Sequence, residues 1–177
     1  MKKVLILAVA AAVVMLMPSF ASAQTANGTL TVTATVQGSI NLVFNSDATG
    51  VALAGSGTNT ATLAFGNVSA FGALGNPNIV RSVGATSFTV SSAVDVNVTK
   101  TNSASANYTL KAQLGAADAV NSWAVGGVAV TSGAQATLTA TGTYAANSNF
   151  PVAITIPFTT ASGTAISNTI NYTATAN

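Results

Sequence analysis

Apolar residues alternate with hydroxyl-bearing and other polar residues through most of this chain beyond its N-terminal region. An alternation of period two places successive side chains on opposite faces of a β-strand, so that one face is apolar and the other is polar. The pattern occurs over 30–36, 94–99, 108–114, 136–141, 152–158 and 170–175. Half-buried antiparallel strands require this pattern, and beyond the N-terminal region the sequence has no stretch with the helical period of 3.6 residues. The chain is therefore predicted to be all-β, with at most one helical turn at 116–120.

Turn-forming residues separate the alternating segments and set the number of strands. Gly126 and Gly127 stand between two valines, and glycine at both central positions of a two-residue turn tolerates the positive φ of a tight hairpin. Further clusters of turn-forming residues occur at 38, 45–47, 55–57, 75–77, 102–103 and 132–133. They divide the chain into roughly nine to eleven short strands, which suits a sandwich or a barrel. Because the spacings between strands are uneven, we favour an Ig-like antiparallel β-sandwich, formed by a single domain over residues 24–177.

Two prolines bracket one of the predicted strands. Pro151 precedes the segment 152–158, and Pro157 lies near its end. Proline has no N–H to donate to a neighbouring strand, so it is confined to edge strands and strand ends. This segment is therefore predicted to be an edge strand or a short one. The alternative is that both prolines protect an exposed edge from pairing with other chains.

The first 23 residues have the pattern of a cleavable, bacterial-type signal peptide. Two lysines are followed by an apolar run over 4–17 and then by small residues at 21–23. This is the arrangement of a Sec-type signal, and the apolar run is shorter than the roughly 20 residues that span a bilayer. Cleavage after Ala23 is predicted to leave a mature chain that starts at Gln24 and has no membrane span. We therefore expect the mature protein to be secreted, on the cell surface or in the periplasm.

Charged side chains make up 5% of the chain, against about 25% in a typical soluble domain. Once the signal is removed, three basic residues balance three aspartates, so the mature net charge is zero. These residues are Arg81, Lys100, Lys111, Asp47, Asp95 and Asp118. Nucleic-acid binding requires a basic patch that releases counterions, which three scattered cations do not provide. A surface without net charge tends to associate, so we expect self-association into filaments or a matrix.

The residue types that most enzymes use are missing, because the chain has no histidine, cysteine or glutamate. A serine nucleophile would lack a histidine base, and a pair of serine with Lys100 or Lys111 is the remaining enzymatic hypothesis. The three aspartates are far apart in sequence, so we expect no catalytic pair. A Ca²⁺ ion bound by Asp47 and Asn45 is an alternative, although an Asx turn explains these residues more simply. We therefore predict a non-enzymatic protein without a cofactor or a metal.

Aromatic residues with polar tips raise the alternative of carbohydrate binding, because exposed aromatic rings stack on sugar faces. Trp123 is the one tryptophan and lies at the start of a strand. There it either caps the core or stands exposed, and an exposed ring would make it the ligand-binding aromatic of a glycan-binding module or adhesin. Tyr108 and Tyr172 lie on the apolar side of their strands and are predicted to be core residues.

The stretch Leu63-Ala64-Phe65-Gly66-Asn67-Val68 resembles the L-x-F-G-x-V sequence of secreted, fimbria-like β-sandwich proteins of the spore-coat-U type. The resemblance extends to a Thr/Val-rich strand soon after the signal and to a strand at the extreme C-terminus. It implies a pilin-type subunit that assembles by donor-strand exchange. Such subunits commonly carry a disulfide, which this chain lacks, and the departure bears on whether a chaperone assists assembly.

Residues 29–36 are the segment best suited to strand exchange. Its four apolar residues would enter a neighbouring subunit as plugs, and head-to-tail contacts of this kind generate open filaments. These residues are Leu30, Val32, Ala34 and Val36. The alternative is that the segment pairs within its own domain, because only Gly38 separates it from the next strand. We predict an extracellular structural subunit that self-associates through this segment, with a carbohydrate-binding module centred on Trp123 as the alternative.

Overall fold

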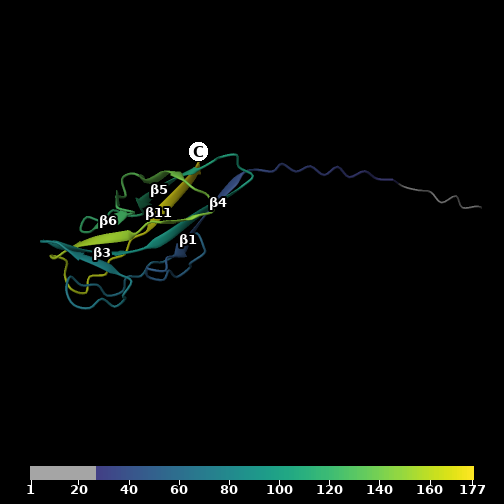
Figure 1. Ribbon diagram of the computed structural model, residues 1–177. Coiled ribbons are helices and arrows are strands. Elements are labelled where there is room, and N and C mark those ends of the chain that lie inside the picture. Colours follow the sequence, from purple (N-terminus) through teal and green to yellow (C-terminus); the bar gives the residue numbers. More distant parts are fainter. Residues whose placement is uncertain (1–26) are drawn as a thin grey trace, which may run out of the picture. The chain divides into compact units, whose positions relative to one another are not determined.

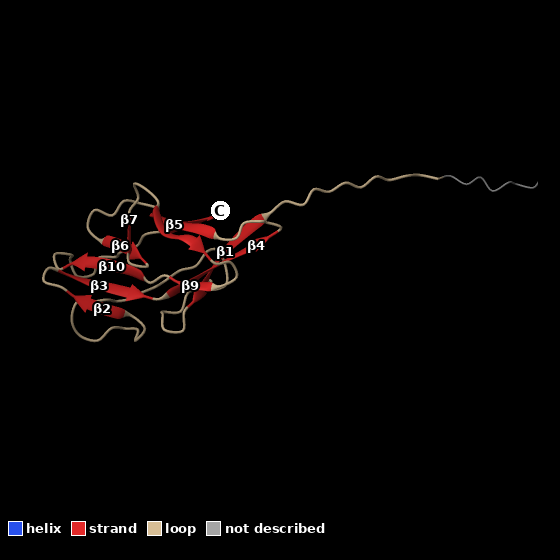
Figure 2. Cartoon of the chain, turned by 45° about the horizontal axis from the view of Figure 1, so that its top comes forward, coloured by secondary structure: helices blue, strands red, loops and turns tan. Residues whose placement is uncertain are grey.

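The computed structural model describes residues 27–177, which form strands, turns and loops and contain no helix (Figures 1 and 2). The all-β prediction is therefore confirmed. Met1–Thr35 and Val36–Asn177 form two separate units, and every described strand belongs to the second of them. The predicted signal peptide, with its cleavage site after Ala23, lies outside the described residues and stays a prediction.

The described residues form eleven strands in three antiparallel sheets, which agrees with the predicted number of strands. The strands are β1 (Ser39–Ser46), β2 (Val80–Val83), β3 (Ser87–Ser92), β4 (Val94–Thr101), β5 (Tyr108–Leu114), β6 (Ser122–Val125), β7 (Val128–Val130), β8 (Ala136–Gly142), β9 (Asn147–Asn149), β10 (Val152–Pro157) and β11 (Ile170–Ala176). Two sheets have three strands, in the orders β1-β4-β9 and β11-β5-β8, and the third has the order β2-β3-β10-β6-β7. This architecture is consistent with a β-sandwich.

Two clusters of buried side chains hold these sheets together. The smaller cluster lies between β4 and β5, where its side chains have no exposed surface. Its members are Val96, Val98, Tyr108 and Leu110. The larger cluster centres on the five-stranded sheet and includes Val90, Trp123, Val125, Val152, Ile154 and Ile156. Buried and half-exposed residues alternate strictly along β5, so the pattern seen in the sequence does place one face of this strand in the core.

The predicted hairpin at the two adjacent glycines is confirmed. Gly126 and Gly127 connect β6 to β7, and Val125 pairs with Val128 across the turn. The φ angles of the two glycines are 57° and 78°, which is the left-handed region that a two-residue turn of this kind needs at both positions. Local chemistry alone therefore determined this connection.

The prediction that the proline-bracketed segment is an edge strand is wrong. β10 is a central strand, paired with β3 on one side and with β6 on the other. Pro151 lies just before the strand, where its carbonyl accepts a hydrogen bond from the N–H of Gly126 at 2.8 Å, and Pro157 is the last residue of the strand. A strand end tolerates a missing N–H, so prolines at both ends leave the middle of β10 free to pair on both sides.

The buried hydroxyl of Tyr108 provides a test of the smaller cluster. Its oxygen has no hydrogen-bond partner among the described residues, although the side chain has no exposed surface. Tyr108→Phe removes this unsatisfied oxygen without breaking a hydrogen bond. We therefore expect the free energy of unfolding to stay unchanged or to rise by up to about 1 kcal/mol. Urea unfolding followed by tyrosine fluorescence or circular dichroism measures this. A loss of stability above about 1 kcal/mol would mean that the hydroxyl bonds to a buried water.

Candidate functional site

The predicted assembly segment, residues 29–36, belongs to no strand of the described chain. Leu30 is 86% exposed, Val32 is 81% exposed and Val36 is 75% exposed, and Ala34 is exposed as well. The alternative, that this segment pairs within its own domain, stays a prediction. An unpaired segment with an apolar face and an open backbone is suited to pairing with the sheet edge of another chain.

Strand β11 pairs with β5 on one side, and within the described chain no strand pairs with its other side. At the two ends of this pairing, the N–H of Gly115 donates to the carbonyl of Thr169 at 2.7 Å and the N–H of Asn177 donates to that of Asn107 at 3.1 Å. Backbone groups of an antiparallel strand point alternately to its two sides, so the odd-numbered residues of β11 face β5. The residues whose N–H and C=O groups line the free edge are therefore Ile170, Tyr172, Ala174 and Ala176.

Strand β1 pairs with β4, and its second edge is partly covered by a loop. The N–H of Phe44 donates to the carbonyl of Thr58 at 2.8 Å, and the carbonyl of Phe44 accepts from the N–H of Gly57 at 2.7 Å. By the same alternation, the backbone groups of Ile40 and Leu42 face this side too, where the described chain supplies no strand. The free part of this edge is thus shorter than that of β11.

The two free edges lie beside each other at a place that we call the β1–β11 seam, formed by Leu42, Phe44, Tyr172 and Ala174. The rings of Phe44 and Tyr172 meet edge to face, with 5.0 Å between their centroids. All four side chains pack against the smaller buried cluster, yet each is only half-buried. The core is therefore incompletely covered along the seam, between two strands that have unused backbone groups.

Trp123 is 7% exposed and belongs to the larger buried cluster, so its ring is not available to stack on a sugar. On β6 it lies between Ile154 of β10 and Val130 of β7. Its indole Nε1–H donates to Oδ2 of Asp118 at 2.8 Å. The hypothesis of an exposed, ligand-binding Trp123 is thus corrected in favour of the core position, because the alternation along β6 places Trp123 and Val125 on its buried face.

Asp118 organises the segment before β6, where one helical turn was considered and none is found. Its Oδ1 accepts hydrogen bonds from the backbone N–H of Val120 at 3.0 Å and from that of Asn121 at 2.9 Å. The side-chain amide of Asn121 donates to both carboxylate oxygens, and Trp123 donates to Oδ2. Burial raises the pKa of Asp118, but these hydrogen bonds outweigh that effect and lower the pKa to about 2.

The lowered pKa of Asp118 predicts a pH-dependent contribution to stability. Because the pKa in the folded state lies below the ordinary 3.8, the ionised carboxylate stabilises the fold above about pH 4, and this stabilisation is lost as the pH falls towards 2. We expect Asp118→Asn to lower the thermal unfolding midpoint at pH 7 by about 3 °C, since at least one hydrogen bond to a charged acceptor is lost. The difference between variant and parent should shrink between pH 4 and pH 2. A difference that stays constant across this range would contradict the assignment.

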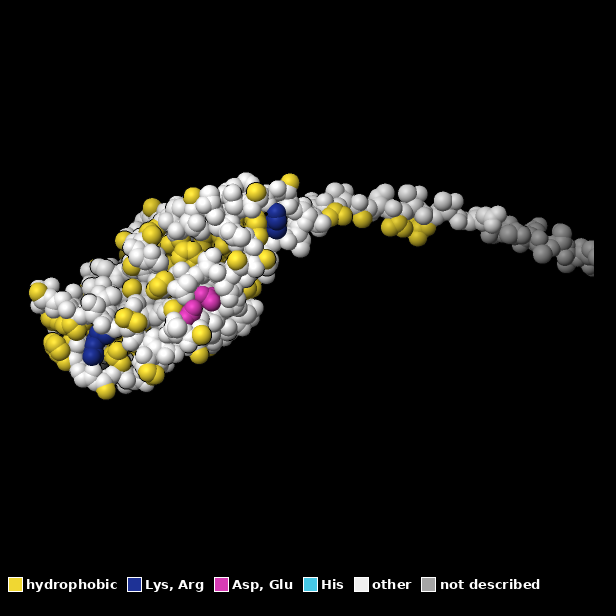
Figure 3. Space-filling model, viewed as in Figure 1, with side chains coloured by type: hydrophobic (Ala, Val, Ile, Leu, Met, Phe, Trp, Pro, Cys, Tyr) yellow, Lys and Arg dark blue, Asp and Glu magenta, His cyan; other side chains and the backbone are white. Residues whose placement is uncertain are grey.

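The structure brings together two aspartates that were expected to be apart. The side-chain amide of Asn149 donates to Asp47 at 2.9 Å and to Asp95 at 3.1 Å, and acidic side chains lie together on the face seen in Figure 3. The N–H of Thr49 donates to Asp47 Oδ1 at 2.7 Å, so the predicted Asx turn is confirmed at Asp47, whereas Asn45 lies in β1 and takes no part in it. The hydroxyl of Thr49 is the main cause that lowers the pKa of Asp47. Within residues 27–177, no three metal-binding side chains of the His, Cys, Asp or Glu type are grouped as a site.

The two lysines considered as catalytic bases have other contacts in the described structure. The Nζ of Lys100 donates to the backbone carbonyl of Ser105 and lies 5.0 Å from the ring centroid of Tyr144. Lys111 lies on β5 opposite Thr173 of β11, at a half-exposed position of the strand. No hydrogen bond joins either lysine to a serine hydroxyl in this part of the chain, so the Ser–Lys hypothesis gains no support from the geometry.

No family model, curated protein or solved structure matches this chain. Between residues 27 and 177 there is also no helix of the length and apolar character that crosses a membrane. The candidate function therefore rests on the free strand edges, the unpaired segment and the chemistry of the described side chains.

Proposed function

We propose that this chain is a non-enzymatic structural subunit that is exported by its Sec-type signal and assembles into filaments or a surface matrix by β-strand addition. Residues 29–36 of one copy would pair with the free edge of β11 in the next copy. The observation that carries the proposal is the combination, in one chain, of an unpaired alternating segment and an unpaired strand edge above a half-buried core. The segment is a potential strand without a partner, and the edge of β11 has backbone groups that no strand of its own chain pairs with.

The segment and the edge are similar in length and period. The segment has apolar side chains at every second position over 30–36, and β11 has free backbone groups at every second position over 170–176. Pairing would satisfy those backbone groups and would place apolar plugs over the β1–β11 seam. We prefer β11 to β1 as the acceptor because Thr58 already bonds to Phe44 on the free side of β1.

The distribution of charge supports association between copies. Charged side chains make up 5% of the chain, and on the face shown in Figure 3 they are few, with the acidic side chains together and the basic ones apart from them. Neither the segment 29–36 nor the free edge 170–176 contains a charged residue. Electrostatic repulsion between approaching subunits is therefore small, and contacts between edges are not opposed.

The resemblance of residues 63–68 to fimbria-like proteins of the spore-coat-U type leads to the same proposal. It would make the chain a pilin-type subunit of the bacterial surface with an Ig-like topology. Head-to-tail pairing through strand addition is heterologous, since the donor and the acceptor are different parts of the subunit. Such contacts form a ring only if the rotation from one subunit to the next closes a circle, and otherwise they extend into filaments.

Negative-stain electron microscopy of the purified mature chain, residues 24–177, tests the proposal. We expect filaments whose number and length increase with protein concentration. A chain that starts at Ser39 keeps all described strands but lacks the assembly segment, and it is the matched control. This control should remain monomeric in analytical ultracentrifugation. A mature chain that is monomeric at every concentration would contradict self-assembly, and filaments of the truncated control would place the contact elsewhere.

A further inference from the structure

The side chains along the free edge of β11 become smaller towards its C-terminus. Ile170 and Tyr172 are large and pack against the buried clusters, whereas Ala174 and Ala176 have only a methyl group each. Ala174 is half-buried and Ala176 is exposed. A methyl group covers less of the core than a ring or a branched chain does, so the core is least covered at the C-terminal end of this edge.

The apolar side chains of the assembly segment 29–36 have a complementary order of size when the segment runs antiparallel to β11. Leu30 and Val32, near its start, are large, and Ala34 is the one small side chain among the four. Directly opposite residues of an antiparallel pair have their side chains on the same face, where the two are neighbours. When the four apolar residues overlap fully with the four edge residues, a large side chain lies beside a small one at three of the four positions.

We propose that the segment of one copy pairs antiparallel to β11 of the next copy in a single register, in which Ala34 lies opposite Tyr172 and determines the fit. This inference rests on the strand addition proposed above, and it adds the direction, the register and the residue on which specificity depends. The four inward pairs of this register are Leu30 with Ala176, Val32 with Ala174, Ala34 with Tyr172, and Val36 with Ile170.

The acceptor has little space beside Tyr172. The tyrosine ring packs against both buried clusters and meets the ring of Phe44 edge to face, with 5.0 Å between the centroids. A shift of the segment by two residues in either direction would place Val32 or Val36 opposite Tyr172. Parallel pairing with the same overlap would place Val32 there as well, and every strand pairing in the described chain is antiparallel. The proposed register therefore combines full overlap with a small side chain at the ring.

Disulfide crosslinking of the mature chain tests the direction and the register, because the chain has no cysteine of its own. In the proposed register Thr31 of one copy lies opposite Thr175 of the next, on the outer face, with about 4.5 Å between their Cα atoms, which a disulfide can bridge. We expect Thr31→Cys/Thr175→Cys, oxidised with glutathione disulfide during assembly, to give a ladder of linked chains on a non-reducing gel. Thr31→Cys/Asn171→Cys is the matched control. Its two positions are four residues out of register, about 13 Å, and it should give no ladder.

Exchanging the side chains at positions 32 and 34 tests the role of Ala34. The double variant Val32→Ala/Ala34→Val keeps the composition of the segment. In the proposed register it places a valine against the Tyr172 ring and leaves a void over Ala174, so we expect the concentration required for filaments to rise at least about tenfold. Val32→Ile adds one methyl group over Ala174 and should assemble within about threefold of the parent.

The outcomes separate this inference from the proposed function. If the parent forms filaments but the pair at 31 and 175 gives no ladder, the register is overturned and strand addition stands. The same holds if the exchanged variant needs an unchanged or lower concentration than the parent. A parent that forms no filaments at any concentration overturns both. A disulfide within a single chain of Thr31→Cys/Thr175→Cys would show that the segment pairs within its own domain, which also overturns both.

Discussion

Val32→Asp is expected to abolish filament formation while leaving the folded unit intact. Val32 is 81% exposed and lies outside the strands, so the charge costs the isolated subunit nothing in packing. In the proposed assembly the same side chain would be buried over the β1–β11 seam. An unpaired buried carboxylate costs several kcal/mol, which corresponds to a loss of at least about a hundredfold in association. Light scattering and negative-stain microscopy at matched concentration measure the effect.

The neighbouring threonine supplies a matched control for this substitution. Thr33→Asp introduces the same charge one position later, where the period of two directs the side chain away from the seam. This variant should still form filaments. Val32→Asp subunits keep the acceptor edge of β11, so small amounts added to the parent should shorten its filaments by capping one end. Equal assembly by both variants would show that the segment does not enter a neighbour with Val32 inward.

Gly142→Ala is expected to destabilise the fold by about 3 kcal/mol. Gly142 lies opposite Tyr108 in the pairing of β5 with β8. A Cβ atom at this position would lie 2.3 Å from Cζ and 2.4 Å from Cε2 of Tyr108. The tyrosine ring has no exposed surface and packs against Tyr144, with 5.2 Å between the ring centroids, so it has little room to move. Overpacking in a dense core costs roughly 1–3 kcal/mol, and a clash this close belongs at the upper end.

Urea unfolding of Gly142→Ala should show a lower midpoint with an unchanged dependence of the free energy on urea concentration. Gly133→Ala is the control, because a Cβ atom at Gly133 would meet nothing within 4 Å and its φ is not in the left-handed region. Its stability should stay within about 0.5 kcal/mol of the parent. If the two variants were equally stable, the close packing of the Tyr108 ring on β8 would be contradicted.

Several features followed directly from local sequence. The alternation over 108–114 predicted β5 and its buried face, because a period of two is a property of the single strand and requires no knowledge of its neighbours. The adjacent glycines predicted the β6–β7 turn, since two positive φ values are a local demand. The Asx turn at Asp47 is local in the same way.

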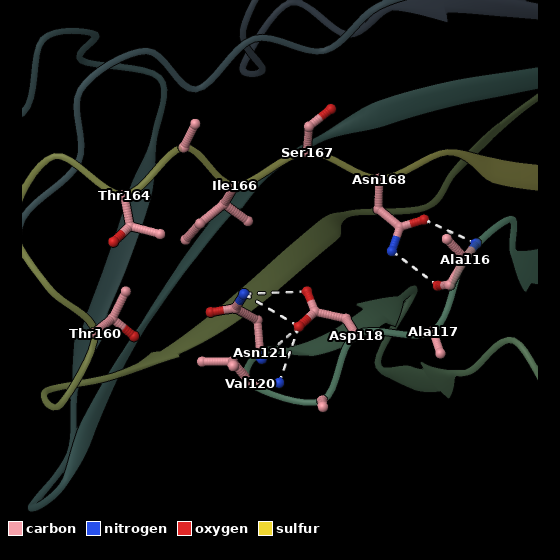
Figure 4. Close-up of a pocket in the computed structure, with 12 residues that line it drawn as sticks. Ala116, Ala117, Asp118, Val120, Asn121, Thr160, Thr164, Ile166, Ser167 and Asn168 are labelled. Carbon is pink, nitrogen blue, oxygen red and sulfur yellow. Dashed lines mark hydrogen bonds between the residues drawn. The ribbon is translucent and has the colours of Figure 1, made fainter.

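Other features were missed because they depend on which strands become neighbours. The sharing of Asn149 by Asp47 and Asp95 arises from the pairing of β4 with both β1 and β9, between residues about fifty positions apart or more. A pocket of about 330 Å³ is lined by residues of 116–121, by Thr160 and by residues of 164–168, loops that are far apart in sequence and carry no shared motif (Figure 4). Asp118 carried a usable signal for the turn before β6. An aspartate side chain commonly accepts hydrogen bonds from backbone N–H groups two and three residues later, as Asp118 does from Val120 and Asn121.

The sequence by itself determined the secondary-structure class, the buried faces of strands such as β5 and β10, the hairpin at the two adjacent glycines and the scarcity of charge, all of which are properties of neighbouring residues in the chain. Only the tertiary structure decided that β10 is central, that Trp123 is buried and that β11 keeps a free edge. The physical reason is that alternation assigns each side chain to a face but does not choose the partner of a strand. Partner choice depends on long-range packing, and the proposed site consists of the edges that this packing leaves unpaired.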